Sequence, residues 1–444
     1  GMYMNERKFF QSAAVLTITN GLLRLTDIWY RGYLCTHLGT AAMGLYQLNL
    51  SVFVLGVSLS AAGASFCTTR MVAEHGNDRR IIRKCLCFSL LISCSACLLF
   101  ELLAPLFGPL LSGSLPLRIL AVGLPFISVC ACLKGCFLAE GKSGVPAVAE
   151  VVEQGATIGL GILFLDDFSS SITAVMTAST TAEAVGCTFM IFCYLKKMPH
   201  HKTCAAPIPS FCQIAAIGLP VLGGAGLRSF LFSVENLLIP RGLSSFCSRE
   251  EALSQYGLVQ GMMMPILVFP CTILSSATLL LIPELARSNS HGQPKRIRRI
   301  TTKAFCLTSC FSFICAALMA AFSSQLCQLF YKSQDAAVLI RIMVPLIPLL
   351  YLDSVVDGML KGLNQQKYSL CCNLVDAVFR VSWCFFLIPI LGLKGYLLLL
   401  FCSELLNSSL SINKLLNTAD IEISPLWILT PASGAVLLYL CLSL

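Results

Sequence analysis

Three charged residues in one apolar stretch near the start of the chain could bind an anion. Arg24, Asp27 and Arg31 stand at positions i, i+3 and i+7, and on a helix of 100° per residue they fall within about 60° of one another. A guanidinium binds phosphate in bidentate fashion and stays charged where water is excluded. The pattern therefore predicts a helix face that lines an anion-binding cavity. The alternative is a local Arg24–Asp27 ion pair that holds two helices together.

A second apolar stretch repeats this arrangement. Arg228 and Glu235 again stand at i and i+7, and Arg241 follows. An ionisable side chain at bilayer depth costs at least ~2.5–3.5 kcal/mol on insertion scales, so each one demands a reason. We expect the two stretches to face each other across a cavity for an anionic substrate. The predicted substrate-binding residues are Arg24, Asp27, Arg31, Arg228, Glu235 and Arg241.

The composition indicates that membrane-spanning helices position these residues. The 444 residues are 56% apolar and 12% charged, with a mean hydropathy of +0.80, which is not the composition of a soluble protein. Apolar stretches of about 20 residues, the length that crosses hydrocarbon, recur along the chain without strand-period alternation. We therefore predict an all-α integral membrane protein with about 13 transmembrane helices. They lie near residues 9–30, 44–69, 85–110, 117–139, 144–165, 172–195, 211–234, 256–282, 304–326, 337–359, 368–390, 395–414 and 425–443.

The distribution of basic residues predicts the orientation in the membrane. Lysine and arginine are concentrated around residues 70–84 and 287–303, between predicted spans. By the positive-inside rule these loops are cytoplasmic, and so is the N-terminus. We expect a multi-pass protein of the cell (plasma) membrane. The net charge of +9 is explained by these loops and by anionic lipid headgroups, so no nucleic-acid partner is expected.

The chain contains an internal repeat. Eight of the 44 positions in residues 31–74 recur at an offset of 210, among them Arg31 with Arg241. A second match at an offset of 223 pairs Arg118 with Arg341. Six predicted spans precede the Pro- and Lys-bearing linker at residues 196–210, so both copies enter the membrane from the same side. We predict two six-helix lobes related by a parallel repeat, 1–205 and 206–444, the second with one extra C-terminal helix, and a substrate path between them.

Several residue types argue against an enzyme. The 24 cysteines lie mostly inside predicted spans, where a thiol behaves as a small hydrophobe. All five histidines stand in predicted loops, and no GxxxxGK[ST] motif is present. We predict no catalytic residues, no metal site and no cofactor. Prolines are expected to bend or break the seventh, eighth and tenth spans, and they could line a cavity, form hinges or simply serve helix packing. They are Pro220, Pro265 with Pro270, and Pro345 with Pro348. A Lys134–Asp357 pair that could form a gate also remains open.

Four stretches resemble a known family. Residues 20–48, 61–76, 234–243 and 275–288 are similar to the stage V sporulation protein B group of polysaccharide-type flippases. These belong to the multidrug/oligosaccharidyl-lipid/polysaccharide exporter superfamily, with the lipid II flippases and the MATE (multidrug and toxic compound extrusion) transporters. The resemblance implies two six-helix lobes in a MATE-like V around a central cavity, with Arg24 near a cavity-lining basic position. The sporulation group usually has fourteen spans, one more than we predict here.

The leading functional hypothesis is a flippase. It would move an undecaprenyl-linked saccharide, a polysaccharide or peptidoglycan precursor such as lipid II, from the inner to the outer leaflet by alternating access. The alternative is a cation-coupled, MATE-type multidrug exporter, against which the intramembrane arginines argue. The expected partners are the lipid-linked oligosaccharide, membrane lipids and a coupling ion, Na⁺ or H⁺. We expect the protein to act as a monomer.

Overall fold

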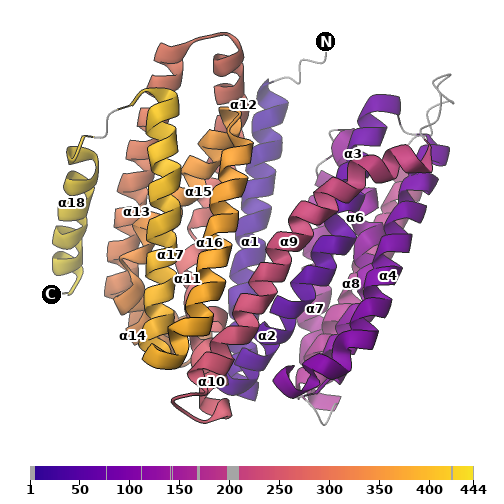
Figure 1. Cartoon of the computed structure of the whole chain (residues 1–444), viewed down its shortest axis with the longest axis horizontal. Coiled ribbons are helices and arrows are strands. Elements are labelled where there is room, and N and C mark those ends of the chain that lie inside the picture. The colour runs from indigo at the N-terminus through magenta and orange to yellow at the C-terminus, as the bar shows by residue number, and fades with distance from the viewer. Residues whose placement is uncertain are drawn as a thin grey trace. The chain divides into compact units, whose positions relative to one another are not determined.

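The computed structural model of the chain is built from helices (Figure 1). It describes residues 6–76, 78–111, 113–140, 142, 144–167, 171–197, 210–421 and 424–443. These residues contain no β-strand, which confirms the predicted all-α class. They form two compact units, and each unit is described by itself below.

The first unit joins the start of the chain to its C-terminal half, residues 1–44 and 238–444. Its helices are α1 (Glu6–Leu38), α10 (Arg249–Tyr256), η2 (Gly257–Met263), α11 (Met264–Val268), α12 (Cys271–Ser290), α13 (Pro294–Tyr331), α14 (Asp335–Met343), α15 (Leu346–Gly362), α16 (Gln366–Phe386), α17 (Ile388–Ala419) and α18 (Leu426–Ser443). The helix α1 packs against α12 and α13, and α18 packs against α13.

The second unit consists of residues 45–237. Its helices are most of α2 (Thr40–Val57), η1 (Ser58–Ala62), α3 (Gly63–His75), α4 (Arg79–Leu111), α5 (Leu115–Val122), α6 (Leu124–Ala139), α7 (Gly144–Asp167), α8 (Ser171–Lys197) and most of α9 (Phe211–Leu243). Close packing of α9 on α3 is possible because small residues stand at the contact. A Cβ on Gly63 would lie 2.7 Å from the Leu222 side chain, and one on Gly218 would lie 2.8 Å from the Cys67 sulfur.

The lengths of the helices agree with a membrane-spanning fold. Ten helical segments of the described chain are long and apolar enough to cross a membrane, and twelve if each of two bent helix pairs is one span. The predicted first span lies in α1, a further helix of 33 residues. The prediction of about 13 spans is therefore roughly supported, and the chain is a multi-pass membrane protein.

Prolines stand at both bends. The α10–α11 segment and α12 meet at 53° around Pro270, and α14 and α15 meet at 63° around Pro345. Proline lacks the N–H that continues a helix, and its ring clashes with the preceding turn. Nearby carbonyls are satisfied by buried tyrosines, because Tyr331 donates to the Met262 carbonyl at 2.8 Å and Tyr351 to the Leu267 carbonyl at 2.7 Å. The predicted interruptions of the eighth and tenth spans are confirmed. The predicted break in the seventh span is not seen, because α9 continues through Pro220 as one helix from Phe211 to Leu243.

The order of elements supports the internal repeat. The helix α2 begins at Thr40 and α10 at Arg249, close to the offset of 210 found in the sequence. A π-helical segment follows each of them, η1 and η2. Further along each half, a long helix (α4 or α13) is followed by an interrupted helix, which is α5–α6 in the first half and α14–α15 in the second. The predicted lobe boundary at residues 205/206 lies outside the described residues and stays a prediction.

A candidate anion-binding cavity

The position of α1 depends on a close contact with the end of α13. A Cβ on Gly32 would lie 1.7 Å from the carbonyl oxygen of Phe330, a distance that no side chain tolerates. Only glycine lets the two backbones approach this closely. Since Gly32 follows directly on Arg31, this contact fixes the helix that carries the predicted anion-binding face.

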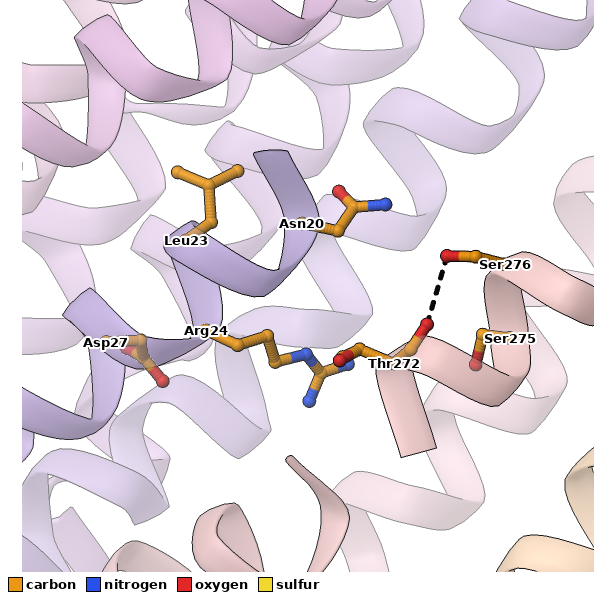
Figure 2. Close-up of a pocket in the computed structure, with 7 residues that line it drawn as sticks. All are labelled: Asn20, Leu23, Arg24, Asp27, Thr272, Ser275 and Ser276. Atoms are coloured by element: carbon orange, nitrogen blue, oxygen red, sulfur yellow. Dashed lines mark hydrogen bonds between the residues drawn. The ribbon is translucent and has the colours of Figure 1, made fainter. Parts of the chain in front are cut away.

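A polar cavity lies between α1 and α12, wholly within the first unit. Its volume is about 420 Å³, within the range of small-ligand pockets. Figure 2 shows the α1 residues on one side of it and three hydroxyl side chains of α12 on the other. The lining residues are Asn20, Leu23, Arg24, Asp27, Thr272, Ser275 and Ser276. The structure thus brings Arg24 and Asp27 together at one cavity.

Arg24 extends from α1 toward Thr272 at the start of α12 (Figure 2). Its side chain is exposed, and it makes no ion pair with any described residue. The alternative Arg24–Asp27 pair is not formed. Instead, Nε of Arg31 donates to Oδ2 of Asp27 at 2.8 Å, with the Arg31 side chain only 13% exposed. Arg24 is therefore free to bind a ligand anion, while Asp27 is neutralised by Arg31.

The α12 side of the cavity supplies hydroxyl groups. Ser275 and Ser276 each donate to the backbone carbonyl four residues earlier, both at 3.0 Å, and Thr272 donates to the Phe269 carbonyl at 2.7 Å. A hydroxyl can rotate to donate to a ligand instead. The break at Pro270 also puts the first turn of α12, with its partial positive charge, beside the cavity.

Sequence reasoning did not assign these hydroxyl residues to the site. Ser275 is one of the eight positions that match in the repeat at the offset of 210, where it pairs with Ser65, but this match gives it no binding role. No spacing rule links α12 to α1, because residues 24 and 272 meet only in the folded chain. Pro270, which sets where α12 begins, was the one sequence feature that could have pointed to these hydroxyl residues.

The predicted residues of α9 are distributed over both units. Arg228 and Glu235 belong to the second unit, and Arg241 belongs to the first. Arg228 and Arg241 are exposed, whereas Glu235 is 5% exposed and has a partner. Arg228 makes no ion pair with a described residue. That Arg228 and Glu235 face the α1 residues stays a prediction.

A separate charged cluster lies in the second unit. Nζ of Lys134 on α6 lies 3.5 Å from Oε1 of Glu150 and 4.0 Å from Oε2 of Glu153, both on α7. In the first unit, Asp357 pairs with Lys361 at 2.6 Å. Each member of the Lys134–Asp357 pair left open by the sequence thus has another partner in its own unit.

A polar network crosses α15, α16 and α17. Asn407 donates to Oδ2 of Asp353 at 2.9 Å, and Ser403 links Asp376 to Arg380. Oδ1 of Asp353 and Oδ1 of Asn407 are buried and have no hydrogen-bond partner among the described residues. Two buried acceptors without donors are costly. Within the described chain, no group of three or more His, Cys, Asp or Glu residues is arranged to hold a metal ion.

Two family models match the chain. The model of the "Polysaccharide biosynthesis protein" family matches residues 9–289, which include both α1 and α12. The MatE model matches residues 225–386. The first match covers more than half of the chain and includes every residue of the cavity.

Known proteins with related sequences or folds agree with these matches. Stage V sporulation protein B of Bacillus subtilis (strain 168) is 22% identical over 416 residues, which cover 88% of this chain and 80% of that protein. The structure of the lipid II flippase MurJ in an inward closed conformation is similar, with a TM-score of 0.71 at 13% identity, covering 97% and 98% of the two chains. An inward-facing multidrug resistance MATE transporter of the MOP superfamily gives 0.70 at 15% identity, covering 96% and 98%.

Proposed function

Because the chain belongs to the polysaccharide biosynthesis protein family, we propose that it is a flippase for an undecaprenyl-linked saccharide. The saccharide would be a polysaccharide or peptidoglycan precursor such as lipid II, moved from the inner to the outer leaflet without covalent change. The cavity that contains the unpaired Arg24 is the observation that carries this proposal. Two similarities of the chain support the proposal as well. Its sequence is related to stage V sporulation protein B, and its fold is similar to that of the lipid II flippase.

The charges of the cavity suit a pyrophosphate. Arg24 and Asp27 line the cavity, and Arg31, which does not line it, pairs with the negative charge of Asp27. The three residues together carry one net positive charge. Arg24 would bind the pyrophosphate through charge-assisted hydrogen bonds, and the hydroxyls of α12 would complete its coordination. Arg228 of α9, which is exposed and has no carboxylate partner in the described chain, is proposed as a second anion ligand. Glu235 and Arg241 would act near it.

Transport would follow alternating access. The saccharide and pyrophosphate would occupy the polar cavity while the polyprenyl tail stays in the bilayer. Irregular backbone next to a cavity is typical of transporters, because it is tolerated only where protein or water satisfies it. In this chain, the interrupted segment α10–η2–α11, which ends at the bend before α12, is such irregular backbone next to the cavity. The protein is proposed to lie in the plasma membrane with its N-terminus on the cytoplasmic side. Topology reporters fused before and after α1 can test this orientation.

A proton is proposed as the coupling ion. Asp353 and Asn407 present two buried acceptor oxygens without donors in the described chain, and protonation of Asp353 would supply a donor. Transport in proteoliposomes should then respond to a pH gradient, and Asp353→Asn should remove that response. Dependence on a sodium gradient at constant pH would assign the role to Na⁺ instead.

Binding of purified protein to lipid II and to undecaprenyl-pyrophosphate glycans in nanodiscs tests the proposal. We expect Arg24→Ala to weaken binding about 10- to 100-fold, the effect of losing hydrogen bonds between charged groups. Arg24→Lys should retain part of the affinity, because it keeps the charge but loses the bidentate geometry. Arg249→Ala, which removes an exposed arginine outside the cavity, serves as the control. Equal affinity in all variants would refute the assignment of this cavity.

The second candidate is a cation-coupled multidrug exporter. The MatE match and the fold of the MATE transporter favour it, and so does the carboxylate network around Asp353. Organic cations such as ethidium would then bind the purified protein, and Asp27→Asn or Asp353→Asn would abolish this binding. Binding of organic cations without binding of lipid-linked glycans would replace the flippase proposal.

A further inference from the structure

A second cavity borders the opposite face of α12. It has a volume of about 550 Å³ and lies between α12, α13 and α15, within the first unit. Its walls are nearly all carbon, with Leu274 and Leu281 of α12 and Leu307 and Phe311 of α13 among them. Even Thr278 presents little polarity, because its hydroxyl donates to the Leu274 carbonyl at 2.8 Å. Such a cavity suits an apolar chain.

One end of this cavity is cationic. Lys303 is the single charged residue among the described residues that line it. The short turn between α12 and α13 makes them antiparallel neighbours, so Leu281 and Lys303 lie toward the turn while Leu274 and Phe311 lie deeper. Lys303 and Phe311 are eight positions apart, which corresponds to about 12 Å of helix. The cavity is therefore an apolar slot with a positive end.

The positive end extends along α13. Arg296, Arg299 and Lys303 stand at i, i+3 and i+7, on one helix face. Arg296 pairs with Glu284 of α12, whereas Arg299 and Lys303 are exposed and make no ion pair with a described residue. Lys303 thus gives the slot its positive charge, and Arg299 stands one helical turn before it on the same face of α13.

The length of α13 locates this positive end near the membrane surface. The helix has 38 residues, or about 57 Å, while the hydrocarbon core is about 30 Å thick. Its basic first turns must therefore lie outside the hydrocarbon. Lys303 is the last basic residue before the apolar part of α13, so we expect it near the surface of the hydrocarbon, where phospholipid phosphates lie. Basic pockets at this level between transmembrane helices attract anionic headgroups.

We propose that this slot binds one acyl chain of an anionic phospholipid, with the phosphate held by Lys303 and Arg299. The slot is separate from the Arg24 cavity, and the proposal does not depend on the transported substrate. Its apolar walls exclude free phosphate as the occupant. Its volume of about 550 Å³ suits a single acyl chain rather than a polyprenyl tail of many isoprene units.

Native mass spectrometry of the purified full-length protein, titrated with phosphatidylglycerol or phosphatidylcholine, tests the site. Wild type should retain phosphatidylglycerol at least about tenfold more tightly than phosphatidylcholine. Lys303→Gln should remove most of this preference. Ala277→Trp, a change at an exposed lining position, should reduce retention of both lipids by filling the slot.

Matched variants keep the test specific. Arg298→Gln removes the same charge from an exposed position on a different face of α13 and should leave the preference unchanged. Equal retention of both lipids by wild type, or equal effects of Lys303→Gln and Arg298→Gln, would overturn the proposal. Displacement of phosphatidylglycerol by undecaprenyl phosphate at lower concentration, lost in Lys303→Gln, would identify the carried lipid as the occupant and also overturn it.

Discussion

Nε of Arg31 donates to Oδ2 of Asp27 at 2.8 Å, one helical turn apart on α1. The carboxylate on this helix face is therefore paired with Arg31, and Arg24 enters the same cavity without a carboxylate partner in the described chain. A paired aspartate beside an unpaired arginine gives the cavity a net positive charge. That charge favours an anionic ligand and disfavours an organic cation.

Asp27→Asn separates the two functional hypotheses by the sign of its effect. Removing the negative charge of Asp27 makes the cavity more positive, so affinity for undecaprenyl-pyrophosphate glycans should rise by about two- to tenfold. A multidrug exporter would instead lose affinity for organic cations. The measurement is ligand titration in nanodiscs, with Asp420→Asn as the control, because Asp420 is exposed and lies outside the cavity. An unchanged affinity in Asp27→Asn would disconnect this residue from either ligand.

Gly32→Ala should destabilise the packing of α1 on α13. The new methyl group would overlap the Phe330 carbonyl oxygen, and relief of such overpacking typically costs about 1–3 kcal/mol. Gly21→Ala on the same helix is the control, since a Cβ there meets nothing within 4 Å and alanine is the better helix former by up to about 1 kcal/mol. Thermal unfolding in detergent should show a lower midpoint for Gly32→Ala and an equal or higher one for Gly21→Ala. The opposite order would contradict the close contact.

Lys134 and Glu153 should be energetically coupled. Lys134→Met leaves Glu150 and Glu153 without their neighbouring cation, and loss of one partner of a buried pair costs up to about 3–5 kcal/mol. Because Lys134 is 21% exposed, we expect the lower end of that cost. The double variant Lys134→Met/Glu153→Gln should be less destabilised than the sum of the single variants, as unfolding midpoints in a double-mutant cycle would reveal. Additive effects would exclude coupling at this cluster.

Asp78 should make the start of α4 sensitive to acid. The Arg80 guanidinium donates to its carboxylate, with Nη2 to Oδ2 at 2.8 Å, and the Arg80 backbone N–H donates to Oδ1 at 2.8 Å. These hydrogen bonds, the side-chain ones first, hold the pKa of Asp78 below its usual range. A lowered folded pKa contributes stability that is present above the unfolded pKa, near 3.9, and is lost as the pH falls through the folded value.

Asp78→Asn tests this dependence. Asparagine can still cap the helix, but it cannot titrate. The difference in unfolding midpoint between wild type and Asp78→Asn should be constant from pH 7 to about 5 and should shrink as the pH falls below the ordinary aspartate range. Glu250→Gln, an exposed first-turn carboxylate of α10, provides the comparison. A constant difference down to the lowest accessible pH would show that the charge of Asp78 adds nothing.

The class of the fold could be predicted from the sequence because it follows from local properties. Hydropathy over about 20 residues identifies membrane-spanning helices, since backbone groups in hydrocarbon must be satisfied within the segment. The bends at Pro270 and Pro345 were equally predictable, because proline removes a helical hydrogen bond wherever it stands. The clustering of Arg24, Asp27 and Arg31 on one face required only the helical period.

The cavity itself depended on the tertiary structure. Helical spacing allowed both Arg24 and Arg31 to pair with Asp27, and it left undecided which of them would. The choice depends on the rotamers and packing of α1 against α13, where Gly32 permits contact with Phe330. The hydroxyls of Thr272, Ser275 and Ser276 face Arg24 because α12 begins after a bend and packs against α1.

The sequence by itself determined that this is a multi-pass helical membrane protein with an internal repeat, and it predicted arginines within the apolar spans. Hydropathy and helical faces depend on residues that are neighbours in the chain, and the repeat is found by comparing the chain with itself. One sequence is therefore enough to detect these properties. Only the tertiary structure decided which arginine stays unpaired and which helix supplies its polar neighbours. It also decided that an apolar slot ends at Lys303. Such properties arise from contacts between residues far apart in the chain, which neither periodicity nor composition records.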